Sequence, residues 1–358
     1  MGRMAKRRVT IADVAARAGV GKSTVSYVMN ASRTRVPISE KTRERVLEAA
    51  RECGYHPNAA ARALSTSRTG HIGFILSDRI SGGWANAYFA QIFTGVEAAA
   101  RRRGYGLNAS LYNLSSIDSF VFPARVGQRS VDGLVLTGHV EAAVAERFRE
   151  FQIPCVCIGD DTEVAGLIPT IATDIVSGTL EAVRHAAELG HKNVCYCRFQ
   201  SRRGREVADA LLERMASDPL TSQCRMAMFD PADQVDYRSA EPLLEWWRMM
   251  PEVERPTVIL TSDQAALAFL GQLTKHGLAC PRDVSVISTC DSDLCRICHP
   301  ALTAMDLSVT RLGEIAVELL IDHLEQDAPL TPQMSHNDHP CRLVVRDSCS
   351  RPGQTLSK

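Results

Sequence analysis

The feature that most constrains the fold is an alternation of short apolar runs with longer amphipathic segments, which begins near residue 71. Short apolar runs are typical of strands buried on both faces, and apolar residues spaced three or four apart are typical of helices that cover a sheet. This alternation predicts parallel sheets with helices on both faces. The predicted strands are Ile72–Leu76, Leu107–Leu111, Gly133–Leu136, Cys155–Ile158, Val194–Cys197, Met226–Phe229, Thr257–Leu260 and Val284–Ile287. The predicted helices are Phe89–Arg103, Ala142–Phe151, Gly178–Leu189, Arg205–Met215, Ala240–Met249, Ala265–His276 and Val309–Glu325.

These strands, spread over about 280 residues, fit two doubly wound subdomains better than one large sheet. In such a fold a ligand binds between the halves, beyond the carboxyl ends of the strands. The hydrophobic content of 45% is sufficient for cores of this size. We therefore predict an α/β core with a ligand cleft between its two halves.

The N-terminal residues follow a different pattern, that of short helices. Thr10 can cap a first helix, with Asp13 in the position of a capping box, and Gly19 can end that helix. A second helix is predicted over Lys22–Met29, and a third begins after Ser39. The spacing therefore predicts a small, all-helical head.

The chain is accordingly divided into three parts. Pro57 ends the head, so the head spans residues 1–57. A short Ala-rich helix and a Ser- and Thr-containing linker occupy residues 58–70. The α/β core spans residues 71–350.

Charge is divided unevenly between these parts, although the formal net charge of the whole chain is zero. Residues 1–70 contain 14 Lys and Arg against 5 Asp and Glu, a net of +9, and the other 288 residues contain 27 against 36, a net of −9. A basic head on an acidic body is typical of a protein that binds a polyanion, most often nucleic acid. The alternative is a basic face that is merely solvated.

The first two predicted helices have the pattern of a helix-turn-helix. Ala15 and Ala18 are small enough to let two helices approach closely, and Gly19 permits a tight left-handed turn. The second helix then leaves a polar outer face, which suits it for the major groove of DNA. The side chains expected on that face are Lys22, Ser23, Ser26 and Tyr27.

The chain resembles the LacI/GalR family of bacterial transcription regulators. The segments that carry the resemblance are Thr10–Asn30, Ser39–Val46, Gly54–Asn58, Ala61–Leu64, Ile72–Leu76, Gly95–Ala99, Val131–Leu136, Leu189–His191, Pro281–Val286, Pro300–Asp306 and Leu343–Arg346. The resemblance implies a helix-turn-helix head and a periplasmic-binding-protein-like core. It also implies a homodimeric repressor that binds a pseudo-palindromic operator and responds to a small-molecule effector, a sugar or a related metabolite. Whether the effector releases DNA or promotes its binding stays open.

By this resemblance, particular residues contact DNA. Leu64 corresponds to the position at which the family wedges a leucine into the minor groove, which bends DNA. Tyr27 departs from the arginine that is frequent in the family, and this removes a fork that could read guanine. The implied DNA-binding residues are Thr10, Lys22, Ser23, Thr24, Ser26, Tyr27, Asn30, Asn58, Ala61 and Leu64.

The resemblance also places an effector site in the core. Arg205 fits an arginine at the start of the helix that follows the fifth strand, and Asp263 fits the acid of an Asn-Asp pair. Where the family has two consecutive acids, this chain has Cys290 and Asp291, so its effector either differs from an ordinary sugar or does not exist. Tyr88, Phe89 and Asp174 are further candidates, with a purely structural role as the alternative for each.

Two other motifs are treated as coincidences. The segment 16–23 fits a loose phosphate-binding loop, but such a loop needs a strand before it, and here a helix is predicted. Cys295, Cys298 and His299 spell the haem-attachment pattern, for which the alternative is a redox- or metal-sensing thiol pair with Cys290 as a third thiol. No common catalytic motif is present, so we expect neither an enzyme nor a cofactor or metal.

The expected compartment is the cytosol. No apolar run approaches the roughly 20 residues that span a bilayer, and the basic N-terminus does not continue into a signal-peptide core. The twelve cysteines lack the spacing of a disulfide framework, so we expect reduced thiols. A solute-binding protein of the periplasmic type would share the predicted core, but it would lack the helical head.

Overall fold

The computed structural model describes residues 9–29, 38–55, 68–198, 201–231, 235–326 and 329–353. The chain forms two compact units. The first, called the head unit, is Met1–Gly70 with Gln128–Asp132, and the second, called the core unit, is His71–Gly127 with Gly133–Lys358. Among the described residues, no helix is both long enough and apolar enough to cross a membrane.

The described head unit contains α1 (Ile11–Ala18), α2 (Lys22–Met29) and α3 (Glu40–Cys53). Local signals set these boundaries. The backbone N–H of Thr10 donates to the carboxylate of Asp13 at 2.8 Å, which fixes the start of α1. Gly19 and Gly54 end α1 and α3 in the left-handed conformation, with φ of 61° at each, which glycine adopts without steric cost. The predicted head helices are therefore confirmed.

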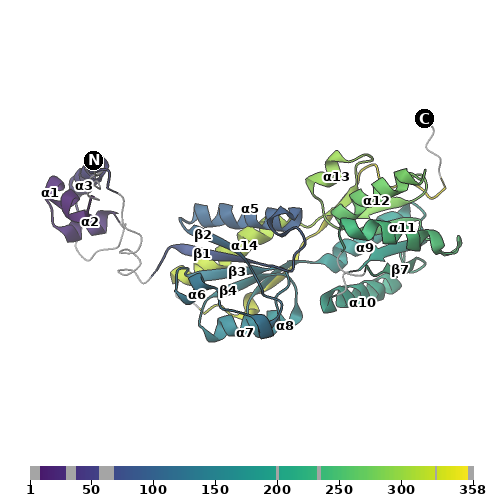
Figure 1. Cartoon of the computed structure of the whole chain (residues 1–358), viewed down its shortest axis with the longest axis horizontal. Helices are drawn as coiled ribbons and strands as arrows, with labels where there is room; N and C mark the ends of the chain where they lie inside the picture. Colours follow the sequence, from purple (N-terminus) through teal and green to yellow (C-terminus); the bar gives the residue numbers. More distant parts are fainter. Residues whose placement is uncertain are drawn as a thin grey trace, which may run out of the picture. The chain divides into compact units, whose positions relative to one another are not determined.

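The first half of the core unit is a sheet with strand order β11-β5-β4-β3-β1-β2. All of its pairings are parallel. Its strands are β1 (His71–Ser77), β2 (Gly106–Tyr112), β3 (Gly133–Thr137), β4 (Cys155–Ile158), β5 (Thr170–Thr173) and β11 (His336–His339). Helices α5 and α14 lie side by side over one face, and α7 lies on the other (Figure 1). The helices of this half are α5 (Ala87–Arg102), α6 (Ala124–Gly127), α7 (Ala142–Glu150), α8 (Thr162–Ala165) and α14 (Val309–Gln326), with short 3-10 turns at Gly83–Ala85, Ile117–Ser119 and Pro332–Met334.

The second half is a sheet with strand order β12-β10-β9-β8-β6-β7, in which only the pairing of β12 with β10 is antiparallel among the described strands. Its strands are β6 (Asn193–Cys197), β7 (Arg225–Phe229), β8 (Val258–Thr261), β9 (Ser285–Ser288), β10 (Thr303–Asp306) and β12 (Arg342–Val344). Its helices are α9 (Ile175–Glu188), α10 (Arg202–Ser217), α11 (Ala240–Met249), α12 (Asp263–Lys275) and α13 (Asp293–Ile297), with a 3-10 turn at Tyr237–Ser239.

Strand β6 illustrates why these sheets need helices on both faces. Successive side chains of a strand point to opposite faces. Val194 and Tyr196 join the core beneath α9 and α10, and Cys195 and Cys197 join a separate core beneath α11 and α12. All four are at most 5% exposed, so a strand without alternating polarity is buried on both sides.

The chain passes between the two halves three times, after β5, after β10 and after β11. The two doubly wound halves were predicted from the sequence, but the strands nearest these crossings were not. Strands β5, β10, β11 and β12 were not among the predicted strands, and β11 is polar throughout. The predicted fold class is confirmed.

Candidate functional site

The described part of the head unit presents α2 on a small apolar core. Val14, Val25 and Val46, one from each helix, are fully buried and hold the three helices together. On the opposite face of α2, Lys22, Ser23 and Tyr27 are exposed. The spacing of four residues between Ser23 and Tyr27 places both on one side of the helix.

The other sequence-predicted DNA contacts divide into two groups. Thr10 is exposed, and Thr24 and Ser26 are partly buried at the edge of the same helical face. Asn30, Asn58, Ala61 and Leu64 lie outside the described residues, as does most of the predicted hinge helix and linker.

The core unit contains a cavity of about 680 Å³ between its two halves. The lining comes from residues that follow strand ends: Gly138 and His139 after β3, Gly159 and Asp160 after β4, Ser262 and Asp263 after β8, and Thr289 and Cys290 after β9. Parallel strands bring such residues together because their carboxyl ends meet at one edge of each sheet. The cavity therefore lies where the sequence predicted a ligand.

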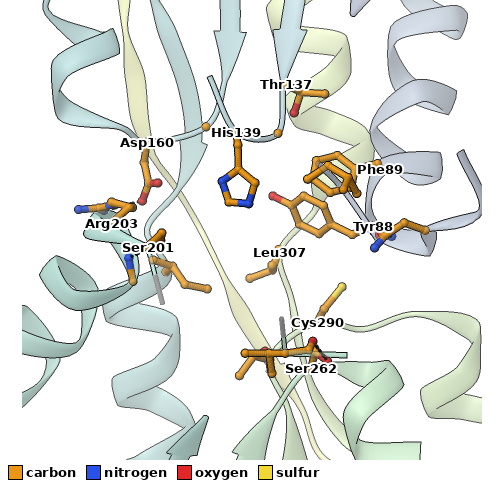
Figure 2. Close-up of a pocket in the computed structure, with 18 of the residues that line it drawn as sticks. Tyr88, Phe89, Thr137, His139, Asp160, Ser201, Arg203, Ser262, Cys290 and Leu307 are labelled. Atoms are coloured by element: carbon orange, nitrogen blue, oxygen red, sulfur yellow. Dashed lines mark hydrogen bonds and ion pairs between the residues drawn. The ribbon is translucent and has the colours of Figure 1, made fainter. Parts of the chain in front are cut away.

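Two aromatic side chains at the start of α5 form one wall of the cavity. The Asn86 side chain accepts a hydrogen bond from the backbone N–H of Tyr88 at 3.1 Å and so caps the helix. The rings of Tyr88 and Phe89 meet edge to face, with centroids 5.0 Å apart. Burial raises the pKa of the Tyr88 hydroxyl well above its ordinary value, so the group is a neutral hydrogen-bond donor at neutral pH. Figure 2 shows this hydroxyl pointing toward His139.

Charged groups line the cavity from both halves. Arg203, at the start of α10, forms an ion pair with Asp160, which follows β4 (Figure 2). Desolvation and the positive charge of Arg79 lower the pKa of His139, which favours the neutral imidazole. Asp263 is 8% exposed and accepts a hydrogen bond from the backbone N–H of Gln264 at 2.8 Å. The cavity thus combines apolar and aromatic surface with a few polar groups, as small-molecule sites do.

Two segments of the chain, one in the head and one in the core, match known sequence families. Residues 10–58 match the lacI family of bacterial regulatory proteins, and residues 183–349 match the periplasmic binding protein-like domain. In its head, the chain is similar to the lacI family. It is a DNA-binding transcriptional regulator and not an enzyme.

Curated relatives match nearly the whole chain. Catabolite control protein A of Priestia megaterium is 26% identical over 350 residues, which cover 95% of this chain and 99% of that protein. The transcriptional repressor PurR of Haemophilus influenzae strain PittEE is 29% identical over 354 residues, covering 95% of this chain and 98% of the repressor.

Solved structures show the same fold. The lac repressor dimer bound to operator and the anti-inducer ONPF has a TM-score of 0.77 at 24% identity, with 96% of this chain and 100% of the other covered. The complex of the transcriptional regulator CelR with cellobiose has a TM-score of 0.64 at 24% identity, with 95% and 100% covered.

Four of the seven predicted effector-site residues line the cavity: Tyr88, Phe89, Asp263 and Cys290. Figure 2 shows the sulfur of Cys290 directed toward the side on which Tyr88 lies. Burial and nearby acids, Asp263 first among them, raise the pKa of Cys290 well above its ordinary value, so it is a neutral thiol.

The other three predicted residues do not line the cavity. Arg205 is exposed, because it lies two residues beyond Arg203 on α10, about 200° further around the helix. Asp174 instead caps α9 by accepting from the backbone N–H of Ser177 at 3.0 Å. Asp291 forms a buried ion pair with Arg346 at 2.7 Å. A contact of these three residues with an effector stays a prediction, and the cavity does not bring them together with the other four.

Sequence reasoning missed Arg203, Asp160 and His139, which all line the cavity. Arg203 could have been found, because Ser201 caps α10 at Gly204 and so places Arg203 in the first turn. Asp160 and His139 follow strands but match no motif, and nothing in the sequence distinguishes them from other loop residues.

The two coincidental motifs remain without structural support. The segment 16–23 runs from α1 into α2, so no strand precedes the residues that would cradle a phosphate. Cys295 is fully buried and the Cys298 thiol donates to the carbonyl of Pro300 at 3.3 Å. Within the described residues, no cluster of His, Cys, Asp and Glu could hold a metal ion. Burial raises the pKa of Cys295, which disfavours the thiolate needed by a redox sensor.

Proposed function

We propose that the chain is a sequence-specific transcriptional repressor whose affinity for DNA depends on a small molecule bound in the core cavity. Two chains pair through their cores and present two copies of α2 to a pseudo-palindromic operator. The proposed division is a DNA-binding domain over residues 1–57, a hinge helix and linker over 58–70, and an effector-binding and dimerisation core over 71–350.

One observation carries the DNA-binding part of the proposal: the described head has a packed apolar core and leaves Lys22, Ser23 and Tyr27 on the opposite face of α2. A helix of this kind fits the major groove, where its first turns reach base edges. The net charge of +9 over residues 1–70 supports electrostatic attraction to phosphates. The proposed contacts outside the described residues, Leu64 above all, rest on the family resemblance.

The cavity supports the effector part of the proposal. Its lining combines the rings of Tyr88 and Phe89 with hydrogen-bonding groups such as Asp263, a mixture that suits a small polar molecule with an apolar face. Similar structures were obtained with cellobiose bound to CelR and with ONPF bound to the lac repressor. We propose a sugar or a related metabolite, with Cys290 in place of a hydrogen-bonding acid favouring a less hydroxylated ligand.

The test is a fluorescence-anisotropy titration with duplexes selected by the protein from a random pool. Tyr27→Ala should weaken specific binding by about five- to 150-fold, since one well-formed base contact contributes about 1–3 kcal/mol. Leu47→Ala is the matched control, because Leu47 is 38% exposed on α3 and Tyr27 is 45% exposed on α2. A protein that enriches no duplex sequence, or that stays monomeric in analytical ultracentrifugation, contradicts the proposal.

A further inference from the structure

Two adjacent arginines of the second half reach across the cleft to two adjacent acids of the first half. Arg202 donates to both carboxylate oxygens of Asp161, at 2.9 and 3.0 Å. Arg203 forms its ion pair with Asp160. These four residues are called the clasp. Both acids follow β4, and both arginines lie in the first turn of α10, so each pair joins one half of the core to the other.

The two pairs of the clasp differ in where they lie. Arg203 and Asp160 line the cavity, with side chains 29% and 25% exposed. Arg202 and Asp161 do not line it, and their side chains are 40% and 37% exposed. The clasp therefore runs from the cavity wall outward to solvent. The outer pair can be altered without removing a group that faces a ligand.

The three chain crossings form a second connection between the halves. The Thr173 hydroxyl donates to the carbonyl of Leu307 at 2.8 Å, which ties the first crossing to the second. The backbone N–H of Asp174 donates to the carbonyl of His339 at 3.0 Å, which ties the first crossing to the third. Thr173 and Leu307 also line the cavity. The cavity is therefore bounded both by covalent connections, which can only bend, and by ion pairs, which can separate.

We propose that the clasp controls opening of the cleft, and so the rate at which small molecules enter and leave the cavity. Charge pairs that are partly exposed to water are individually weak and are screened by salt, which lets them break and re-form. Bending at the three crossings with separation of the clasp is hinge motion of a kind that two-lobed proteins commonly use. The link to gene regulation rests on the proposed function, but the opening of the cleft does not.

The experiment measures opening in the full-length protein by hydrogen–deuterium exchange and by alkylation with iodoacetamide, both read by mass spectrometry. Arg202→Gln should speed exchange in segments 158–165, 170–178 and 303–309 by about two- to fivefold, the size expected from loss of one partly exposed pair. Alkylation of Cys290, which lines the cavity, should accelerate by the same factor. Cys195, which is fully buried in β6, reports global unfolding and should not change.

Arg184→Gln is the matched control, because Arg184 forms an ion pair with Asp218 at 2.5 Å wholly within the second half. It should leave exchange at the cleft unchanged. Exchanging the inner charges, in the double variant Arg203→Asp with Asp160→Arg, should restore the slow exchange that either single variant loses. High salt should speed exchange of the wild-type cleft and have a smaller effect on Arg202→Gln.

The proposal is overturned if Arg202→Gln leaves Cys290 alkylation and cleft exchange at wild-type rates, or if Arg184→Gln changes them equally. All of these measurements are made without DNA or effector. A failure to select an operator would therefore contradict the proposed function but not the role of the clasp. A clasp that does not affect cleft opening would contradict only this inference, and not DNA recognition.

Discussion

Gly95 of α5 lies directly against the backbone of Thr310 at the start of α14. A carbon atom added to Gly95 would come within 1.9 Å of the Thr310 carbonyl oxygen. On the facing helix, a carbon added to Gly313 would come within 2.4 Å of the carbonyl of Ile92. The two helices approach this closely only because both positions lack side chains. This contact joins segments more than 200 residues apart and fixes α14, which follows a strand of the second half, onto the first half.

We expect Gly95→Ala to destabilise the core unit by about 3 kcal/mol, because a backbone carbonyl cannot move aside as a side chain can. Chemical denaturation followed by circular dichroism measures this change. Gly271→Ala is the matched control in α12, where an added carbon meets nothing within 4 Å. It should stabilise by about 0.5–1 kcal/mol through the better helix propensity of alanine. Similar effects of the two variants would contradict the close-approach explanation.

We expect Asp291→Ala to cost about 3 kcal/mol of folding free energy. Its side chain is 4% exposed and is paired with Arg346, which also donates to the carbonyl of Leu302 at 2.6 Å. Removing one partner of a buried pair leaves the other charge without compensation. Arg296→Gln should cost less than about 1 kcal/mol, because Arg296 is 61% exposed and contacts Asp291 at 3.5 Å. Thermal melts of the two variants compare their stabilities. If Asp291→Ala leaves the stability unchanged, the structural role of Asp291 is contradicted and a contact with the ligand is favoured.

The stability of the core unit should fall as the pH drops below 6.5. Burial lowers the pKa of His191 from its ordinary value of 6.5. A hydrogen bond with the Ser350 backbone partly offsets this by raising the pKa, and the charge of His185 lowers it further. The unfolded chain therefore binds a proton at a pH where the folded chain does not, so stability is full above pH 6.5 and declines as the pH falls toward the folded pKa. Urea midpoints at pH 7.5, 6.5 and 5.5 measure the slope. His191→Gln should flatten it, whereas substitution of the exposed His336 should not.

DNA affinity should depend steeply on salt, and Lys22 should contribute to that dependence. Replacing Lys22 with Gln should weaken specific binding by about 1–3 kcal/mol if its ammonium group contacts a base, with loss of preference at one position of the half-site. Lys41→Gln removes the same charge from an exposed position on α3 and should have the smaller effect. Anisotropy titrations at several salt concentrations separate the two variants. Equal losses would mean that only the net charge of the head matters.

The sequence alone determined the features that depend on neighbours along the chain. The start and end of α1 and the start of α3 were predicted to the residue because Thr10, Gly19 and Ser39 act on the backbone within a few residues. The buried central strands were predicted because a run of apolar residues is needed wherever a strand is covered on both faces. Strand β11, with the sequence His-Asn-Asp-His, carries no such signal, since its pairing with β5 at the sheet edge alone makes it a strand.

Tertiary structure decided which side chains share the cavity. The sequence indicated an arginine at the start of α10, but whether Arg203 or Arg205 faces the cleft depends on the rotation of the whole helix against its sheet. Similarly, the sequence indicated Asp291 as a ligand contact, but the fold places Arg346, which is 55 residues further along, beside it. Helix caps and strands arise from short-range backbone preferences. A cavity depends on the packing of segments that are distant in the chain, and no short stretch of sequence specifies that packing.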